Sequence, residues 1–490
     1  MQFITPARRA RLAWFHTQAG IFLGWLTFII FLAGTLSLAD VELTRWMQPE
    51  TAVIPDGAVL SDAALDRAVQ ILREDEKAGR PRSFIRLPEP RDPALHILHF
   101  NGHAFTGSVI DPRDGRTVPA RDTEGGVFFF NFHYTLRLPY TIGEPLVSFI
   151  TLATGLMILS GVLLQIGRMI PDYFTLRLKA SRPRFLLDLH LLSGTVMLPF
   201  HIIITWTGLV LMTGNAFPFI PVRLPHRPPQ VSGSFVPAAS LGPVLREFRQ
   251  RSGNAPGYII FSPGKITVYG LGSGEISAVR EPLDFDGRTG RLLPGDTKPA
   301  GLTDGITRLA WGLHLARNMG TVLLCLWFTG GVLSTVMIAS GLIYYTTLRR
   351  RRNVSSAPGV AERLCPGAVG GAVVAFFVYL LLNHTLPADM PGRRGFETNG
   401  FFLAWVMCCL AGFLPFARVV AGRFVWSRLV WQAVLALAGI TGLCVVVSDA
   451  VIVLGGLWLH GVRLVINGLC FVTALSCLAG VYGLRRHRVS

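Results

Sequence analysis

Histidine is the residue type whose spacing in this sequence most clearly indicates chemistry. His16 and His190 each lie one or two helical turns inside one end of an apolar segment, and His201 follows His190 by eleven residues. In a straight helix that spacing places two rings about 20° apart around the axis and about 16 Å apart along it. His133 and His314 lie at the opposite end, where later apolar segments begin. An ionisable residue inside a membrane segment is costly and by default indicates function.

These five histidines predict two b-type haems at two depths. Bis-histidine ligation leaves no open position on the iron, which favours electron transfer over oxygen chemistry. We expect His16 to pair with His190 at the inner haem. At the outer haem we expect His201 with either His314 or His133, between which the sequence does not decide. Covalent haem attachment is excluded because none of the seven cysteines lies in a Cys-x-x-Cys-His pattern.

The membrane histidines could also have roles other than haem ligation. A single membrane histidine more often forms an interhelical hydrogen bond, but repetition in register at two depths favours metal ligation. Zinc or copper is disfavoured because no short-spaced Cys/His cluster is present and Asp188 is the one carboxylate beside the histidines. Asp188, two residues before His190, could orient that ligand as a hydrogen-bond acceptor or simply lie at the membrane interface.

Two arginines complete the candidate haem site. Arg137 and Arg317 follow His133 and His314 by four and three residues, at matching places in the chain. Haem propionates need cationic partners, and helical spacing places both arginines to neutralise them. The alternative is an arginine that extends its charged end to the membrane interface.

Eight apolar segments must position these side chains, and each is long enough to cross a bilayer, which takes about 20 residues. We therefore expect an all-α polytopic membrane bundle. The first segment is expected to be an uncleaved span, because its apolar run exceeds that of a signal peptide. The expected spans are Leu12–Leu38, Pro145–Gly167, Phe185–Met212, Thr321–Thr347, Pro366–Asn383, Phe401–Ala417, Leu429–Ser448 and Val462–Leu484.

The formal net charge of +17 indicates the orientation of these spans. All of the excess lies in five short basic segments at alternate ends of the spans, around residues 8–11, 168–184, 349–363, 418–428 and 485–488. Lys and Arg in short loops are retained in the cytoplasm. We expect both termini to be cytoplasmic and the two large segments to lie on the opposite face, which for a bacterial inner membrane is the periplasm. No basic stripe remains elsewhere, so we expect no nucleic-acid partner.

The two large segments are expected to be small α+β modules. Each combines an amphipathic helix, Leu60–Lys77 with a Ser61 cap or Leu241–Arg251, with short alternating strands and an Asp-Gly or Thr-Gly turn. The expected strands are Phe84–Leu87, Ala94–Phe100, Tyr258–Phe261 and Lys265–Leu271. The expected organisation is span 1 (1–38), module 1 (39–144), span 2 (145–167), span 3 (185–213), module 2 (214–309), span 4 (310–348) and a four-helix extension (366–484).

The first four spans contain an internal two-fold repeat. His16, Gly20 and Gly34 have the same spacing as His190, Gly194 and Gly208. The second span of each half carries Met157-Ile158-Leu159-Ser160-Gly161 or Met337-Ile338-Ala339-Ser340-Gly341. Small residues let helices approach closely in lipid, so packing is the simplest role for the glycines.

These residues resemble the PepSY-associated transmembrane helix family, bacterial iron-regulated membrane proteins that include ferric-siderophore reductases. The resemblance covers about residues 1–350. At Ala316 the sequence departs from the glycine that is common there in the family. The motifs that carry the resemblance are His16 after a basic start, Phe132-His133-Tyr134-Thr135-Leu136, Asp188-Leu189-His190-Leu191-Leu192-Ser193-Gly194, Leu313-His314-Leu315-Ala316-Arg317-Asn318-Met319-Gly320, and the turns at Asp111–Arg116 and Asp284–Arg288.

The resemblance implies a haem-b oxidoreductase of the ferric-siderophore reductase type. Such a protein carries electrons to a periplasmic Fe(III)-siderophore, or another Fe(III) chelate, and so releases Fe(II). The sequence has no Gly-x-Gly-x-x-Gly pattern after a strand, so the electron donor is expected to be a cytoplasmic reductase or membrane quinol. The alternatives are a haem-free transporter or permease accessory, and a membrane-anchored regulatory protein whose modules bind a peptide or protease.

Overall fold

The chain divides into two compact units in the computed structural model. The helical unit comprises Met1–Leu38, Phe128–Pro218 and Cys325–Ser490, and the sheet unit comprises Ala39–Val127 and Phe219–Leu324. The structure describes residues 5–80, 83–100, 105–165, 174–216, 235–271, 282–294, 302–317, 319–352, 358–414, 419–420, 423–424, 426–454 and 461–486.

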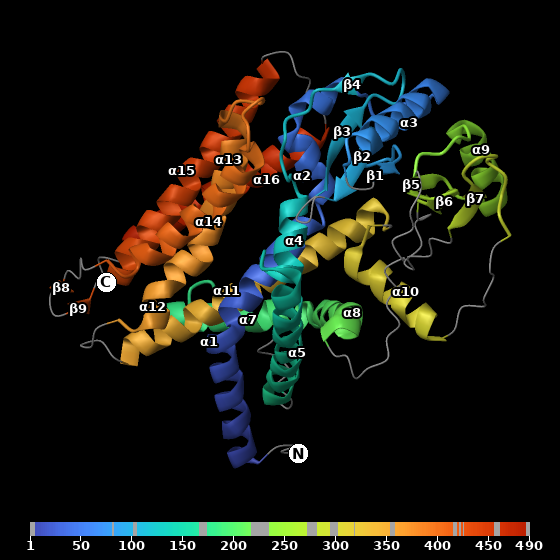
Figure 1. Ribbon diagram of the computed structural model, residues 1–490. Helices are drawn as coiled ribbons and strands as arrows, with labels where there is room; N and C mark the ends of the chain where they lie inside the picture. The colour runs from blue at the N-terminus through green and yellow to red at the C-terminus, as the bar shows by residue number, and fades with distance from the viewer. Residues whose placement is uncertain are drawn as a thin grey trace. The chain divides into compact units, whose positions relative to one another are not determined.

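Long apolar helices make up the helical unit. Helices α13 to α16, coloured orange to red in Figure 1, pack side by side as a bundle. The elements are α1 (Pro6–Ser37), α4 (Val127–Thr135), α5 (Tyr140–Gln165), α7 (Arg182–Val196), α8 (Leu198–Ala216), α11 (Thr321–Arg352), α12 (Val360–Cys365), the π-helix η2 (Pro366–Gly370), α13 (Gly371–Thr385), α14 (Arg393–Ala411), the short strands β8 (Val419–Val420) and β9 (Arg423–Phe424), α15 (Trp426–Leu454) and α16 (Gly461–Arg486).

The prediction of a multi-pass membrane protein is confirmed, with six to seven candidate spans among the described residues rather than eight. Six are single helical stretches, and α7 with α8 counts as a seventh if the bent pair is one span. The predicted span Phe401–Ala417 is not among them, and its residues 415–417 lie outside the described part of the chain. It belongs to α14, whose first two turns carry Arg393, Arg394 and Glu397 and so shorten the apolar stretch.

The predicted span Phe185–Met212 is broken in the middle. Helices α7 and α8 meet at Met197 with a bend of 67°. Pro199 lies in the first turn of α8, where proline is tolerated. Inside one continuous helix it would remove a backbone donor and clash with the carbonyl four residues earlier. The straight-helix relationship expected between His190 and His201 is therefore wrong, because the two residues lie on opposite sides of the bend.

The sheet unit combines one antiparallel sheet with several short helices. The helices are α2 (Asp40–Met47), the 3-10 helix η1 (Pro49–Val53), α3 (Asp62–Lys77), α9 (Leu241–Ser252) and α10 (Leu302–Leu315). The strands are β1 (Ser83–Arg86), β2 (Leu95–Phe100), β3 (Phe105–Ile110), β4 (Thr117–Val118), β5 (Pro256–Ser262), β6 (Lys265–Gly270) and β7 (Leu283–Asp286).

The strands of the two large segments join in a single sheet. The order is β4-β3-β2-β1-β5-β6-β7, and the two segments meet where Ile85 of β1 lies opposite Ile259 of β5. The individual strands and the two amphipathic helices lie close to their predicted positions. The pairing of β1 with β5, which turns two similar modules into one sheet, was not predicted.

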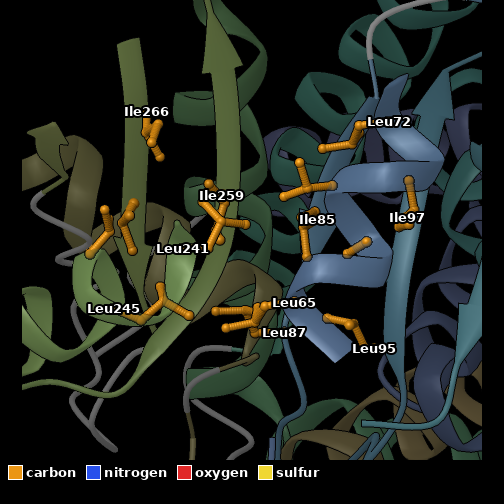
Figure 2. Close-up of a cluster of buried hydrophobic side chains, with 14 of the residues drawn as sticks. Leu65, Leu72, Ile85, Leu87, Leu95, Ile97, Leu241, Leu245, Ile259 and Ile266 are labelled. Carbon is orange, nitrogen blue, oxygen red and sulfur yellow. The ribbon is translucent and has the colours of Figure 1, made fainter. Parts of the chain in front are cut away.

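One face of this sheet forms the core of the unit. Figure 2 shows Leu65 and Leu72 of α3 beside Ile85 and Ile97, and Leu241 of α9 beside the strands of the second segment. These positions follow the helical and strand periods of the sequence. Burial of each such side chain stabilises the fold by about 1.5–3 kcal/mol relative to its exposure to water. The Ser61 side chain accepts a hydrogen bond from the Ala64 amide and begins α3, as predicted.

Candidate functional site

His16 and His190 occupy equivalent positions in the two halves of the repeat. His16 Nδ1 on α1 lies 3.1 Å from the Met157 carbonyl oxygen on α5. His190 Nδ1 on α7 lies 2.7 Å from the Met337 carbonyl oxygen on α11. The first helix of each half is therefore attached through its histidine to the second helix of the same half.

These contacts define the tautomer of both rings. A carbonyl oxygen only accepts, so each Nδ1 must carry the hydrogen and each Nε2 the lone pair. Ser160 and Ser340 donate their hydroxyl hydrogens to the same two carbonyls, both at 2.9 Å. Such an Nδ1–H to carbonyl bond is the usual means of orienting a histidine that binds metal through its other nitrogen.

The two rings also lie close to each other. The His16 and His190 ring centroids are 6.4 Å apart, with an angle of 73° between the ring planes. The structure thus brings together the two residues expected to form the inner pair, from helices far apart in the sequence.

Glycine leaves room beside both rings. A Cβ built on Gly341 would lie 2.9 Å from His190 Nδ1, and one built on Gly161 would lie 3.2 Å from His16 Cε1. The repeated Met-Ile-x-Ser-Gly stretch therefore supplies a carbonyl, a hydroxyl and a gap at each histidine. The repeat is visible in the sequence and predicted helix packing there, but the role of the Met157 and Met337 carbonyls was not predicted, because every residue carries a backbone carbonyl.

His201 is the most deeply buried of the candidate ligands. Its residue is 1% exposed, and its Nε2 has no hydrogen-bond partner among the described residues. A buried polar atom without a partner destabilises a fold by about 1–3 kcal/mol. Coordination of a metal ion by Nε2 would satisfy this atom. The ring centroid lies 6.4 Å from that of Phe31 on α1.

His133 has the same kind of anchor as the inner pair. Its Nδ1 lies 2.8 Å from the Ile30 carbonyl oxygen, so its Nε2 carries the lone pair. A Cβ on Gly34 would come within 2.7 Å of this Nδ1. His133 belongs to the same unit as His201, whereas His314 lies on α10 in the sheet unit. The choice between them for the outer haem stays open.

The predicted propionate partners already have protein contacts. Arg317 donates to Asp40 Oδ2 at 2.7 Å, and Asp40 is buried. The guanidinium of Arg137 lies 5.5 Å from the centre of the Phe128 ring, a cation–π contact. Arg137 itself has left-handed backbone, with φ of 61°. Arg317 directly follows a left-handed residue, Ala316, whose φ is 53°. The departure from glycine at residue 316 thus falls where glycine would be favoured.

Asp188 does not orient His190. Its fully buried carboxylate binds Arg177 Nη1 at 3.0 Å and Arg184 Nε at 2.9 Å, while Met337 holds the histidine. Asp188 therefore neutralises basic residues around the start of α7. In the described ranges no group of three or more His, Cys, Asp or Glu side chains is arranged to hold a metal ion.

Comparison with known proteins identifies a family for most of the chain. The PepSY-associated TM region family matches residues 13–347, which include all five candidate histidines and both arginines. No curated protein matches the chain. Because the match covers well over half of the sequence, the chain belongs to the PepSY-associated TM region family.

Proposed function

We propose that this protein is a haem-b electron carrier of the bacterial inner membrane that reduces a periplasmic Fe(III) chelate. The observation that carries the proposal is the pair His16 and His190, each fixed through Nδ1 to the equivalent methionine carbonyl, with rings 6.4 Å apart. Two imidazoles held in this way would suit the ligation of a low-spin haem iron.

The candidate histidines are sufficient in number to ligate two haems. His16 and His190 would hold the inner haem, and His201 with His133 or His314 would hold the outer one. Each bound haem supplies a one-electron couple, and two histidine ligands leave no position for oxygen. The protein orients the imidazoles and buries them in an apolar bundle, which controls the potential and excludes side reactions.

The positively charged segments and the family resemblance support the direction of transfer. Electrons enter from a cytoplasmic reductase or membrane quinol and leave in the periplasm. There one electron converts each Fe(III) of a siderophore to Fe(II), which hard oxygen chelators hold far less tightly. The product is Fe(II) for uptake and the free chelator.

A reoxidation experiment tests this function. Purified full-length protein is reduced with dithionite, the excess is removed, and a panel of ferric siderophores and simple Fe(III) chelates is added. We expect the reduced haem spectrum to disappear at a rate that depends on the chelate, with Fe(II) trapped stoichiometrically. Indifference to every Fe(III) chelate would refute the substrate class.

A further inference from the structure

Helices α13, α15 and α16 bury a group of charged and polar side chains outside the residues that the family matches. His384 lies near the end of α13, Ser448 and Asp449 near the end of α15, and Arg463 and Asn467 near the start of α16. The side chains of His384 and Asp449 are 0% exposed. Ionisable residues inside a membrane bundle are costly and mark functional sites such as proton relays.

The hydrogen bonds around His384 define its neutral form. Ser448 Oγ donates its one hydrogen to the Val445 carbonyl at 2.8 Å. Ser448 Oγ therefore accepts from His384 Nδ1, which lies 3.2 Å away. With the hydrogen on Nδ1, the lone pair of neutral His384 is on Nε2.

That lone pair lies near a carboxylate. The distance from His384 Nε2 to Asp449 Oδ1 is 3.8 Å, too long for a hydrogen bond. In the neutral form two electron-rich atoms thus lie near each other in a medium of low dielectric constant. A proton on Nε2 would replace this arrangement by an attraction between imidazolium and carboxylate, in addition to the attraction that Asp449 Oδ1 already has to Arg463 Nη1.

Two buried carboxylates of these helices are each paired with an arginine. Asp449 accepts from Arg463 Nη1 and, at 2.7 Å, from Asn467 Nδ2. On α14, beside α13, Glu397 accepts from Arg393 Nη1 and, at 2.8 Å, from Asn383 Nδ2. The two carboxylates are matched by two guanidinium groups, and arginine does not deprotonate in proteins. His384 is thus the group in this cluster suited to gain a proton.

We propose that His384 Nε2 and Asp449 Oδ1 form a buried proton-binding site in the C-terminal helices. The ligand is one proton from water; an N–H bond forms at Nε2, the cluster gains one positive charge, and no electron is transferred. The site involves none of the candidate haem ligands, so its test is independent of the proposed function.

Solid-state NMR of the full-length protein in lipid bilayers, labelled with ¹⁵N-histidine, tests this proposal. The His384 signals are those missing from the His384→Gln spectrum. Between about pH 8 and about pH 5, where histidine normally titrates, we expect them to change from one protonated and one bare nitrogen to imidazolium. Signals that stay neutral throughout this range would overturn the proposal and leave the cluster a structural one.

A charge-neutral double variant tests the role of the carboxylate. Asp449→Asn combined with Arg463→Gln removes the acid without leaving a buried arginine unpaired. We expect His384 to stay neutral over the same pH range in this variant. Imidazolium formation unchanged from the natural protein would exclude Asp449 from the site. His99→Gln, a change in the sheet unit, is the matched control and should leave the His384 titration as it was.

Discussion

The rings of His16 and His190 lie 6.4 Å apart between centroids, with their planes inclined by 73°. Each belongs to a different half of the repeat, and each donates from Nδ1 to a methionine carbonyl of its own half. Both rings therefore carry their lone pair on Nε2 in the neutral form. This relationship is the basis for the proposal that both halves jointly hold one haem.

Removal of either inner histidine should remove one haem and leave the other. We expect His16→Ala and His190→Ala each to lower the haem content by about one per chain, because a bis-histidine haem needs both ligands. The double variant should lose no more than either single one. Pyridine haemochrome assays check this, with His99→Ala as a control that keeps the full content. Additive losses in the double variant would show that the two histidines serve different haems.

The glycine beside His190 should matter more than its counterpart beside His16. A Cβ at Gly341 would lie 2.9 Å from His190 Nδ1 and displace the ring from the Met337 carbonyl, whereas the contact at Gly161 is 3.2 Å. We expect Gly341→Ala to weaken inner-haem binding by about 10- to 100-fold, and Gly161→Ala by less. Haem retention during competition with apomyoglobin measures this.

Gly20→Ala is the control for that comparison. Gly20 lies on the same helix as His16 and has no atom within 4 Å of a built Cβ. Its substitution should leave haem retention unchanged. Equal effects of the Gly20 and Gly341 substitutions would contradict the assigned contact.

Asp92 in the sheet unit should make stability depend on pH. Burial alone would raise the pKa of Asp92, but the charges of His96 and Arg86, with hydrogen bonds from His96 and the Ala94 amide, hold its pKa well below the usual value. A carboxyl whose pKa is lower in the folded state stabilises the fold above its unfolded pKa of about 3.9. That stability is lost as the pH falls toward the folded pKa.

Asp92→Asn should therefore destabilise the sheet unit at neutral pH by about 2 kcal/mol and reduce the acid sensitivity. Pulse proteolysis of the full-length protein, followed at sites in the sheet unit, gives the stability at each pH. An Asp92→Asn profile parallel to that of the natural protein below about pH 5 would contradict the role of this carboxylate.

The backbone at residue 316 should favour glycine. Ala316 has φ of 53° and is fully buried, a conformation that costs an L-residue about 1 kcal/mol. We expect Ala316→Gly to leave stability unchanged or raise it by up to about 1 kcal/mol, because relief of strain offsets the lost methyl contact. Ala316→Val should instead destabilise the protein, because a β-branched residue is strained at positive φ. Thermal unfolding midpoints check both, and a large loss in the glycine variant would be inconsistent with strain at this position.

Local patterns in the sequence predicted much of the fold. The Ser61 cap, helix α3 and the strand around Ile85 lie close to their predicted positions, because caps and alternating burial are properties of short stretches. The pairing of Ile85 with Ile259 was not predictable from such patterns, since it joins strands from distant segments. The break at Met197 did have a signal, Pro199, which the apolar run around it concealed.

The candidate site was also predictable only where local sequence patterns indicate it. Spacing identified His16 and His190, and the structure brings them together. Their anchors are backbone carbonyls of Met157 and Met337, groups that every residue carries. Asp188, by contrast, looked like a partner of His190 because it is near in sequence, yet it binds two arginines.

The haem content of the purified protein is the direct test of the two proposed haem sites. Full-length protein from haem-replete cells, extracted in mild detergent, is assayed for haem per chain and for its reduced absorption spectrum. The proposed function predicts about two low-spin haems per chain, with a split Soret and α-band pattern from two environments. A colourless, folded preparation from such cells would contradict it.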